Sequence, residues 1–398
     1  MLECLQDGAD VNAPGHCGAT PIMTAIETKH QAIFDLLLER GADIERTNDF
    51  NWTPVRFAVM VDWPAAVQRL IDLGVDLGRH PRDPLKKVDL PIGPMFASLP
   101  MPEELKGALS PQEWEESLGQ IDDEMEAMAQ EPRSVIDDAQ SVEVLKLLLA
   151  AGEDLADAPA DVRRDYIGLP SEAPLEIDRA AYEKDRGPRF GTSNPQRIDA
   201  PFWEAMIRCG GNAYVAREKF DDKDYGSPVW CYDRFGHSLT ELPDGRFVGI
   251  AGEHEDAYDP DFCIYNDVIV HDGRGGVSIF GYPRDVFPPT DFHSATLVGN
   301  DIVVIGSLGY PEDRKVGQTP VYRLNLDTMA YSCVTTTGDA PGWISHHRAR
   351  LDSSRNTIRI ERGQVWTHDD EGDPTLLPND GVFELDLIDQ TWQRVAMV

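Results

Sequence analysis

The sequence predicts a multidomain protein of mixed α and β structure, in which a stack of helix pairs is followed by an all-β domain built from repeats. Two internal periodicities carry this prediction. Glycines recur at positions 8, 41 and 74, two steps of 33 residues, and histidines recur at positions 237, 293 and 347, at steps of 56 and 54. With 398 residues, the chain also exceeds the length that one hydrophobic core usually serves.

Two sequence boxes share the 33-residue period. The first begins with glycine at Gly8–Val11, Gly41–Ile44 and Gly74–Leu77, and the second is Thr20-Pro21 and Thr53-Pro54. Proline fits the first turn of a helix, and glycine ends a helix by accepting a left-handed conformation. Each interval therefore predicts a helix, a turn and a second helix. Because both boxes recur in register, this part resembles the ankyrin repeat family, which implies an α-solenoid.

We expect five segments along the chain. They are ankyrin repeats with an incomplete first unit (1–78), a Pro-rich and acidic insertion (79–133), a further ankyrin-like helical unit (134–158), a linker with one docked helix (159–229), and a β domain of about three blades (230–398). The further unit is indicated by Val142–Leu149 followed by Gly152, and the docked helix by Pro201–Arg208. The incomplete first repeat suggests a gene start further upstream.

The C-terminal repeat has the pattern of short β-strands. After each repeat histidine come a turn and an apolar run, which are Phe247–Ile250, Ile302–Ile305 and Thr357–Ile360. Further strands follow, and four short strands in about 50 residues are typical of a propeller blade. The repeat resembles the kelch family, which implies a partial or small β-propeller. Its usual double glycine is replaced by Ala251-Gly252, Gly306-Ser307 and Arg362-Gly363. An open arc and a dimer are both compatible with three blades.

The repeat histidines His237, His293 and His347 occupy equivalent positions, which favours an equivalent structural role over catalysis. We expect each ring to form a hydrogen bond to the backbone of a neighbouring blade.

The composition limits the partners. There are 70 acidic and 36 basic residues, a formal net charge of −34, which argues against nucleic acid and anionic membranes as partners and favours a basic partner, a metal ion or simple solubility. Six scattered cysteines without a C-x-x-C pair indicate neither a disulfide framework nor a zinc knuckle, as in a cytoplasmic protein. We find no apolar run of the roughly 18 residues that a membrane span needs.

An acidic rim is predicted on the β domain. The loops 252–266, 307–318 and 363–379 should leave the same face of their blades. The first loop carries the candidate partner-binding residues Glu253, His254, Glu255, Asp256, Asp259 and Asp261. Such a rim could receive a Lys/Arg-rich peptide or hold a divalent cation such as calcium. The same charges could equally be solvated residues of loop turns. No cofactor is predicted, and a calcium ion stays open.

Two aromatic segments are further candidates. Trp343, His346 and Arg348 combine a stacking surface, ring nitrogens and a cation, and could bind an anionic ligand, although Trp343 could equally be buried between blades. Phe50 and Trp52 precede the second Thr-Pro box, in the finger-like loop through which, by the resemblance, ankyrin arrays contact partners. Both could instead pack on the adjacent unit.

The predicted function is a non-catalytic module that recognises a protein or peptide partner, and the acidic composition favours a basic one. No nucleophile elbow, phosphate loop or H-E-x-x-H motif is present. One alternative is a metal-dependent hydrolase that uses the acidic rim, and another is an immunity-type inhibitor of a basic toxin. We expect a cytoplasmic protein that binds neither nucleic acid nor membrane, and oligomers are compatible with its open repeat ends.

Overall fold

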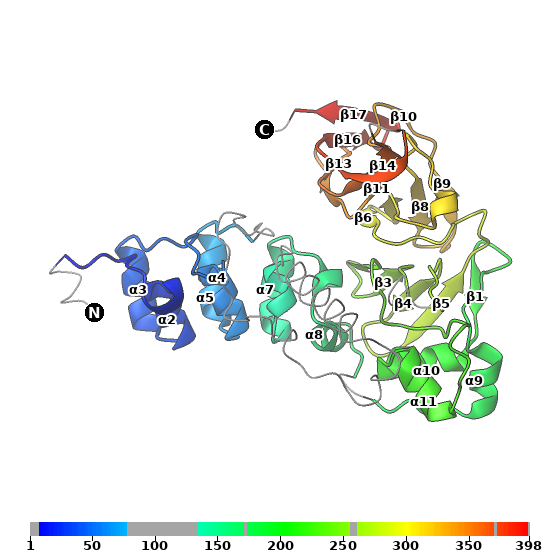
Figure 1. Cartoon of the computed structure of the whole chain (residues 1–398), viewed down its shortest axis with the longest axis horizontal. Helices are drawn as coiled ribbons and strands as arrows, with labels where there is room; N and C mark the ends of the chain where they lie inside the picture. The colour runs from blue at the N-terminus through cyan, green and yellow to red at the C-terminus, as the bar shows by residue number, and fades with distance from the viewer. Residues whose placement is uncertain (1–7, 78–133, 171–172, 255–260, 370–371, 397–398) are drawn as a thin grey trace, which may run out of the picture. The chain divides into compact units, whose positions relative to one another are not determined.

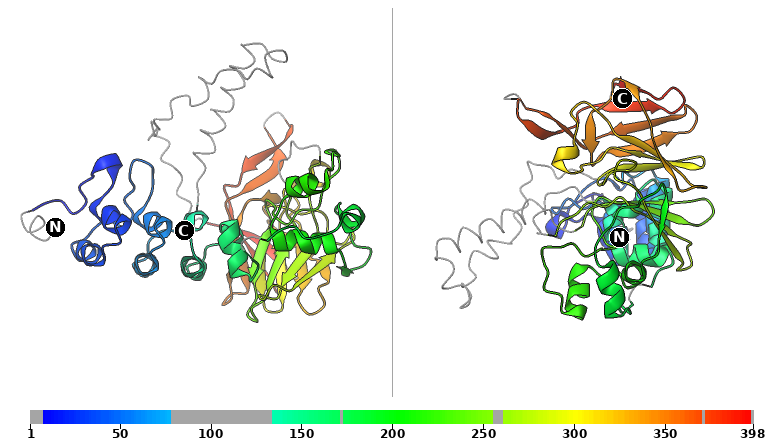
Figure 2. Two further views of the ribbon diagram at one scale, coloured as in Figure 1. Left: turned by 90° about the horizontal axis from the view of Figure 1, so that it is seen from below. Right: turned by 90° about the vertical axis from the view of Figure 1, so that its right-hand side faces the viewer.

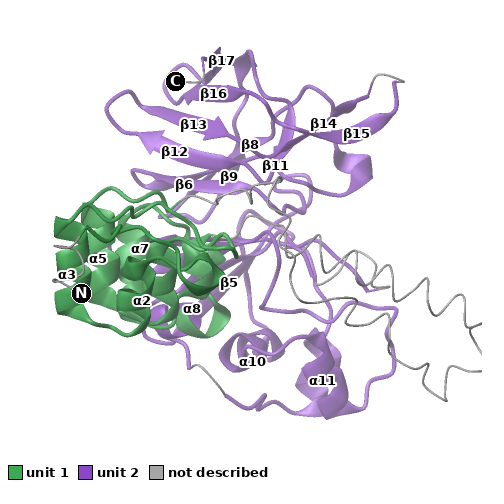
Figure 3. Ribbon diagram, turned by 60° about the vertical axis from the view of Figure 1, so that its left-hand side comes forward, with its two compact units in different colours: residues 1–162 green, residues 163–398 purple. Residues whose placement is uncertain are grey.

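The structure, a computed structural model, describes residues 8–77, 134–170, 173–254, 261–369 and 372–396 (Figure 1). The chain separates into two units, residues 1–162 and 163–398 (Figure 3).

The N-terminal unit is built from helix pairs (Figures 1 and 2). They are α2 (Pro21–Glu27) with α3 (Gln31–Glu39) and α4 (Pro54–Met60) with α5 (Pro64–Asp72), followed by η3 (Val135–Asp138) and α7 (Val142–Ala150). Thr20 and Thr53 are the N-caps of α2 and α4, as the Thr-Pro boxes predict. Helix α7 contacts α5 and η3 contacts α4, although residues 73–134 separate them in the sequence. The helix stack therefore continues beyond the second pair.

The 33-residue period is visible in the backbone. Gly8, Gly41 and Gly74 have φ angles of +90°, +78° and +82°, so the three positions are equivalent. The side chain of Asn12 accepts a hydrogen bond from the backbone N–H of Asp43, and the side chain of Glu45 accepts one from Asp76, 31 residues apart in both cases. Each turn is thus tied to the next by the same kind of contact.

The C-terminal unit contains three successive antiparallel meanders (Figure 1). The first sheet has the order β1-β5-β4-β3-β2, from β1 (Gln196–Ile198), β2 (Ser238–Glu241), β3 (Phe247–Ile250), β4 (Val268–His271) and β5 (Val277–Gly281). The second has the order β6-β7-β8-β9, from β6 (Ser294–Val298), β7 (Asp301–Ile305), β8 (Val321–Asn325) and β9 (Tyr331–Cys333).

The third sheet has the order β10-β17-β16-β13-β12. Its strands are β10 (Thr337–Gly338), β12 (Arg348–Asp352), β13 (Thr357–Glu361), β16 (Val382–Asp386) and β17 (Thr391–Val395). A smaller sheet is formed by β11 (Trp343–Ser345), β14 (Gln364–His368) and β15 (Pro374–Pro378). The apolar runs that the sequence singles out are strands β3, β7 and β13. Among the described residues, no sheet closes on itself.

Two apolar cores join the three sheets face to face. One lies between the first and second sheets and includes Val248, Val270 and Ile302; the other lies between the second and third and includes Ile305 and Ile358. Strands β2, β6 and β12 each lie at one edge of their sheet, and β6 contacts both β2 and β12.

The outer face of the third sheet is polar. Arg355 forms a bidentate ion pair there with Glu384, and Arg359 lies 3.7 Å from Glu361. A sheet face with charged side chains of this kind does not need another sheet to cover it.

The repeat histidines link successive sheets, but not through the backbone as the sequence analysis expected. Nε2 of His293 lies 2.8 Å from the Ser238 hydroxyl, and Nε2 of His347 lies 2.8 Å from the Ser294 hydroxyl. The partner is thus a serine side chain of the preceding sheet. His237 begins the series, and its Nδ1 lies 2.7 Å from the carbonyl oxygen of Arg234.

Residues 159–229 are more structured than a linker with one helix. They contain α8 (Ala160–Tyr166), α9 (Arg179–Asp185), α10 (Pro201–Cys209), α11 (Ala213–Phe220) and strand β1. The expected helix is α10, and its Trp203 is fully buried and stacks on Trp230 with ring centroids 4.8 Å apart. Helices α9 and α11 are short and polar, so their sequences lack a clear apolar stripe.

Acid should destabilise the C-terminal unit. Burial lowers the pKa of His237, His293 and His347 to about 3 and that of His271 to about 4. In the unfolded chain these rings have the ordinary histidine pKa of about 6.5. The stability of the folded unit is therefore highest above that pH, and it falls as the pH drops towards 3, because protons bind the unfolded chain first. We expect up to about 2 kcal/mol of lost stability per ring at pH 5, measured by urea unfolding.

The control for this prediction is His293→Gln, whose amide can still donate to Ser238 but does not titrate. The variant should show a smaller loss of stability between pH 7 and pH 5. Equal stability of the native unit at these two values would contradict the prediction.

Glycine is required where the sheets approach closely. Gly306 has a φ of +77°, and a Cβ there would lie 2.3 Å from the Ile344 carbonyl oxygen, whereas Gly299 has a φ of +61° and open space around it. Gly299→Ala should cost about 1 kcal/mol, the cost of a left-handed residue with a side chain. Gly306→Ala should cost at least about 2 kcal/mol more, because the carbonyl must move. Similar unfolding free energies for the two variants would refute this difference.

Candidate binding sites

A loop of the N-terminal unit presents a cluster of aromatic side chains. The side-chain oxygen of Asn48 accepts hydrogen bonds from the backbone N–H groups of Phe50 and Trp52, at 3.0 and 2.9 Å. The rings of Phe50 and Trp52 lie 5.6 Å apart, and Trp52 meets Phe57 edge-on at 5.7 Å. All three side chains are half-buried. The buried Asn48 therefore fixes a loop that displays part of each ring to solvent.

The unit that carries this aromatic cluster is acidic. Ten acidic and five basic residues lie between positions 8 and 77. The Arg56 guanidinium lies over the Trp52 ring at 5.9 Å and is paired with Asp138 at 2.7 Å. The aromatic cluster thus belongs to a unit with an excess of negative charge.

In the C-terminal unit, the three predicted rim loops do meet. The Tyr310 hydroxyl of the second loop accepts a hydrogen bond from the Ile264 N–H of the first, at 2.8 Å, and its ring meets Phe262 at 6.2 Å. Arg314 of the second loop lies over Trp366 of the third at 4.8 Å.

The predicted rim residues are not all on the surface. Glu255, Asp256 and Asp259 lie outside the described residues. His254 is fully buried and Asp261 is nearly so, whereas the sequence analysis expected an open acidic rim. A buried arginine, Arg217, draws Asp261 inward, because the two form an ion pair.

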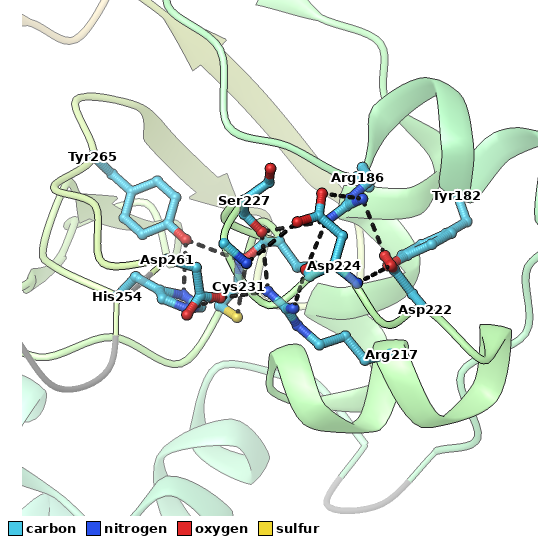
Figure 4. A network of polar contacts seen from close by, with 12 residues as sticks. Tyr182, Arg186, Arg217, Asp222, Asp224, Ser227, Cys231, His254, Asp261 and Tyr265 are labelled. Carbon is cyan, nitrogen blue, oxygen red and sulfur yellow. Dashed lines mark hydrogen bonds and ion pairs between the residues drawn. The ribbon is translucent and has the colours of Figure 1, made fainter. Parts of the chain in front are cut away.

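This ion pair belongs to a polar network that ties α9 and α11 to the first sheet (Figure 4). Asp261 also lies 3.5 Å from His254, whose Nδ1 is 3.2 Å from the Tyr265 hydroxyl. Burial lowers the pKa of His254, although the charge of Asp261 acts in the opposite direction. Arg217 donates further to the backbone carbonyls of Asp224 and Ser227. The network therefore fixes the positions of His254 and Asp261. A partner would have to displace Arg217 to reach the Asp261 carboxylate.

The second half of the network lies on the helices. Arg186 pairs with Asp222 at 3.1 Å and with Asp224 at 3.2 Å, and the Tyr182 hydroxyl donates to Asp222 (Figure 4). Burial tends to raise the pKa of Asp222, but the Tyr182 hydroxyl and Arg186 hold it below its ordinary value. These bonds link residues about 40 positions apart, so no local sequence signal marks them.

The candidate residues around Trp343 lie in different environments. Trp343 is 8% exposed and its indole N–H donates to the Leu308 carbonyl at 3.1 Å. His346 is exposed and stacks on Phe292 at 4.0 Å. Arg348, in β12, occupies the position of the serines that bond to the repeat histidines. The three residues therefore do not form the single stacking surface that the sequence suggests.

A groove of about 530 Å³ opens beside Trp343. Its walls come from β8, β9 and the segments around them, including Pro289, Tyr322, Cys333 and Thr336. The groove has a volume typical of small-ligand sites. Sequence analysis did not identify it, because its walls come from separate segments between residues 288 and 343 that no motif marks.

Comparisons with known proteins identify one part of the chain. The family model described as "Ankyrin repeats (many copies)" matches residues 5–58, which confirms the N-terminal ankyrin identification. The comparison with curated proteins finds no match. Ankyrin repeats indicate a protein-interaction module, while the kelch-like identification stays a prediction.

Two further features are absent from the described residues. We found no group of three or more His, Cys, Asp or Glu side chains arranged to hold a metal ion in this part of the chain. None of its helices is both long and apolar enough to cross a bilayer.

The buried network should be needed for stability. Arg217→Met leaves the carboxylate of Asp261 buried without its ion-pair partner, which should cost about 3 to 5 kcal/mol in unfolding free energy. The matched control is Lys223→Met, because Lys223 pairs with Asp221 in full exposure to solvent and such pairs contribute little. Equal stability of the two variants in urea unfolding would show that the network is dispensable.

Proposed function

We propose that this chain is a protein-interaction module whose N-terminal repeats bind a basic protein or peptide through Phe50 and Trp52. The observation that carries the proposal is the half-buried aromatic cluster, held by Asn48, in an acidic unit. Aromatic side chains dominate the binding energy of protein interfaces, and complementary charge accelerates the encounter and selects the partner.

The loop geometry favours binding at low entropic cost. Both backbone N–H groups are satisfied by one buried side chain, and Asn51 has a left-handed φ of +61° that completes the turn. A loop that is already ordered loses less conformational entropy when it binds a partner. The two rings are therefore presented in one arrangement, as expected of interface anchors.

For the C-terminal unit we infer an arc of three kelch-like blades. Three consecutive meanders whose first strands, β2, β6 and β12, contact one another in chain order support this. The left-handed Gly252, Gly306 and Gly363, which follow the second strand of each meander, support it too. The polar outer face of the third sheet favours an arc that ends in solvent over one that continues into another blade. The cytoplasmic location stays a prediction from the cysteine pattern.

Replacing both aromatic residues should abolish partner capture. Full-length protein is immobilised, exposed to lysate, and the retained proteins are identified by mass spectrometry. In the Phe50→Ala, Trp52→Ala double variant we expect retention of the basic partner to fall by about thirtyfold or more, since hot-spot residues contribute 2 kcal/mol or more. The circular dichroism spectrum should not change.

The matched control removes exposed apolar area elsewhere, by Leu377→Ala and Ile388→Ala, which are 43% and 72% exposed. This variant should retain the partner at the level of the unchanged chain. If the Phe50, Trp52 variant binds its partner equally well, the finger loop is not the binding site.

A further inference from the structure

Strand β9 forms one edge of the second sheet, next to β8 (Figure 1). In this ladder Tyr322 lies opposite Cys333, and in the next pair the Val334 N–H donates to the Val321 carbonyl at 2.9 Å. Residues of an antiparallel ladder alternate between pairs that exchange hydrogen bonds and pairs that do not. The N–H and carbonyl of Cys333 therefore point away from β8, along the free edge of the sheet.

The residue two positions earlier has the same orientation. Tyr331 also directs its N–H and carbonyl away from β8, and the side-chain amide of Asn194 bonds to both at 2.8 Å. Cys333 is exposed, and in the part of the chain that the structure describes its N–H and carbonyl have no hydrogen-bond partner. Asn194 thus covers the edge at Tyr331, and one backbone donor and one acceptor stay open beside it.

The groove of about 530 Å³ adjoins this open position. Cys333 and Val334 line it together with Pro320, Tyr322 and Trp343. A polypeptide that pairs with the edge of a strand is itself extended, so its alternate side chains point to the same face. The groove offers such side chains a largely apolar wall.

These features define the chemistry of the occupant. Main-chain pairing selects an extended segment, and pockets for alternate side chains select its sequence. Valine and other β-branched residues favour the extended conformation. The C-terminal unit has 39 acidic and 24 basic residues between positions 163 and 398, so its net charge favours a basic segment over an acidic one.

We propose that the open edge of β9 at Cys333, with the adjoining groove, binds an extended basic segment of a protein partner that carries β-branched apolar residues at alternate positions. The segment adds a strand to the second sheet. It exchanges main-chain hydrogen bonds with Cys333 and places its apolar side chains in the groove. The inference rests on the proposed function in that it takes the same class of partner, but it assigns a second site, on the C-terminal unit.

The test uses full-length protein and three fluorescein-labelled pentapeptides at physiological ionic strength. The first peptide alternates arginine and valine, beginning and ending with arginine. The second has the same sequence with every backbone nitrogen methylated, so it keeps the side chains and cannot donate main-chain hydrogen bonds. The third replaces both valines with glycine. Binding is measured by fluorescence anisotropy.

Two variants change the edge itself. Cys333→Pro removes the open N–H, and because this group does not pair with β8, proline is compatible with the strand. Cys333→Ser is the matched control, since it changes the side chain and keeps the N–H. The melting temperature shows whether each variant is folded.

The unchanged chain should bind the arginine–valine peptide about tenfold or more tightly than the methylated peptide and the glycine peptide. Cys333→Pro should weaken binding of the first peptide by about fivefold, the effect of one main-chain hydrogen bond, and Cys333→Ser should not weaken it. Equal affinity of the unchanged chain for the first peptide and either of the others would overturn the proposal. Undiminished binding by folded Cys333→Pro would do so too, and if this variant does not fold, the peptide comparison decides.

Two further measurements separate other occupants and sites. A dimer of the unchanged chain in sedimentation velocity that Cys333→Pro abolishes would show that a second copy takes the edge, against the proposal. The Phe50, Trp52 double variant should bind the arginine–valine peptide as the unchanged chain does. If it loses the peptide while Cys333→Pro keeps it, the finger loop is the peptide site and the edge proposal is refuted. If it keeps both the peptide and the lysate partner, the proposed function fails and the edge proposal stands.

Discussion

The C-terminal unit depends on one strand that buries side chains on both faces. Along β7, Ile302 and Val304 contribute to the core shared with the first sheet, while Val303 and Ile305 contribute to the core shared with the third. This alternation gives the middle sheet two apolar faces, so it is stable only between two others. The first and third sheets each need one apolar face towards it. The order of the sheets along the chain follows from that requirement.

Once the sheets are stacked, their edges become the remaining exposed backbone, and one short segment covers two of them. Strand β1 pairs antiparallel with β5, the edge of the first meander. Just before it, Asn194 exchanges hydrogen bonds of 2.8 Å with the N–H and carbonyl of Tyr331 in β9, the edge of the second. Unpaired edges invite association with other chains. The segment that reads as a linker is therefore structural.

The sequence predicts the repeats well because each one begins and ends its helices with the same local residue pattern. The Thr-Pro boxes cap α2 and α4, and the glycines that follow the helices are left-handed, since these effects act within a few residues. The sequence does not predict the ion pair of Arg217 with Asp261, 44 residues away, or the serine partners of the repeat histidines. Those contacts depend on how sheets and helices pack, and no spacing along the chain encodes them. For the same reason, His254 looks like a rim residue in the sequence and is buried in the structure.

The serine and histidine pairs between sheets resemble the nucleophile and base of a hydrolase, but their environment opposes that role. A general base works best when its pKa is near the working pH, and burial lowers the pKa of His293 and His347 to about 3. Ser238 is itself buried, so a substrate could reach its hydroxyl only by separating the sheets. The same pair also occurs twice, in equivalent places, as a structural contact of a repeat does. These serines and histidines therefore serve to join the sheets.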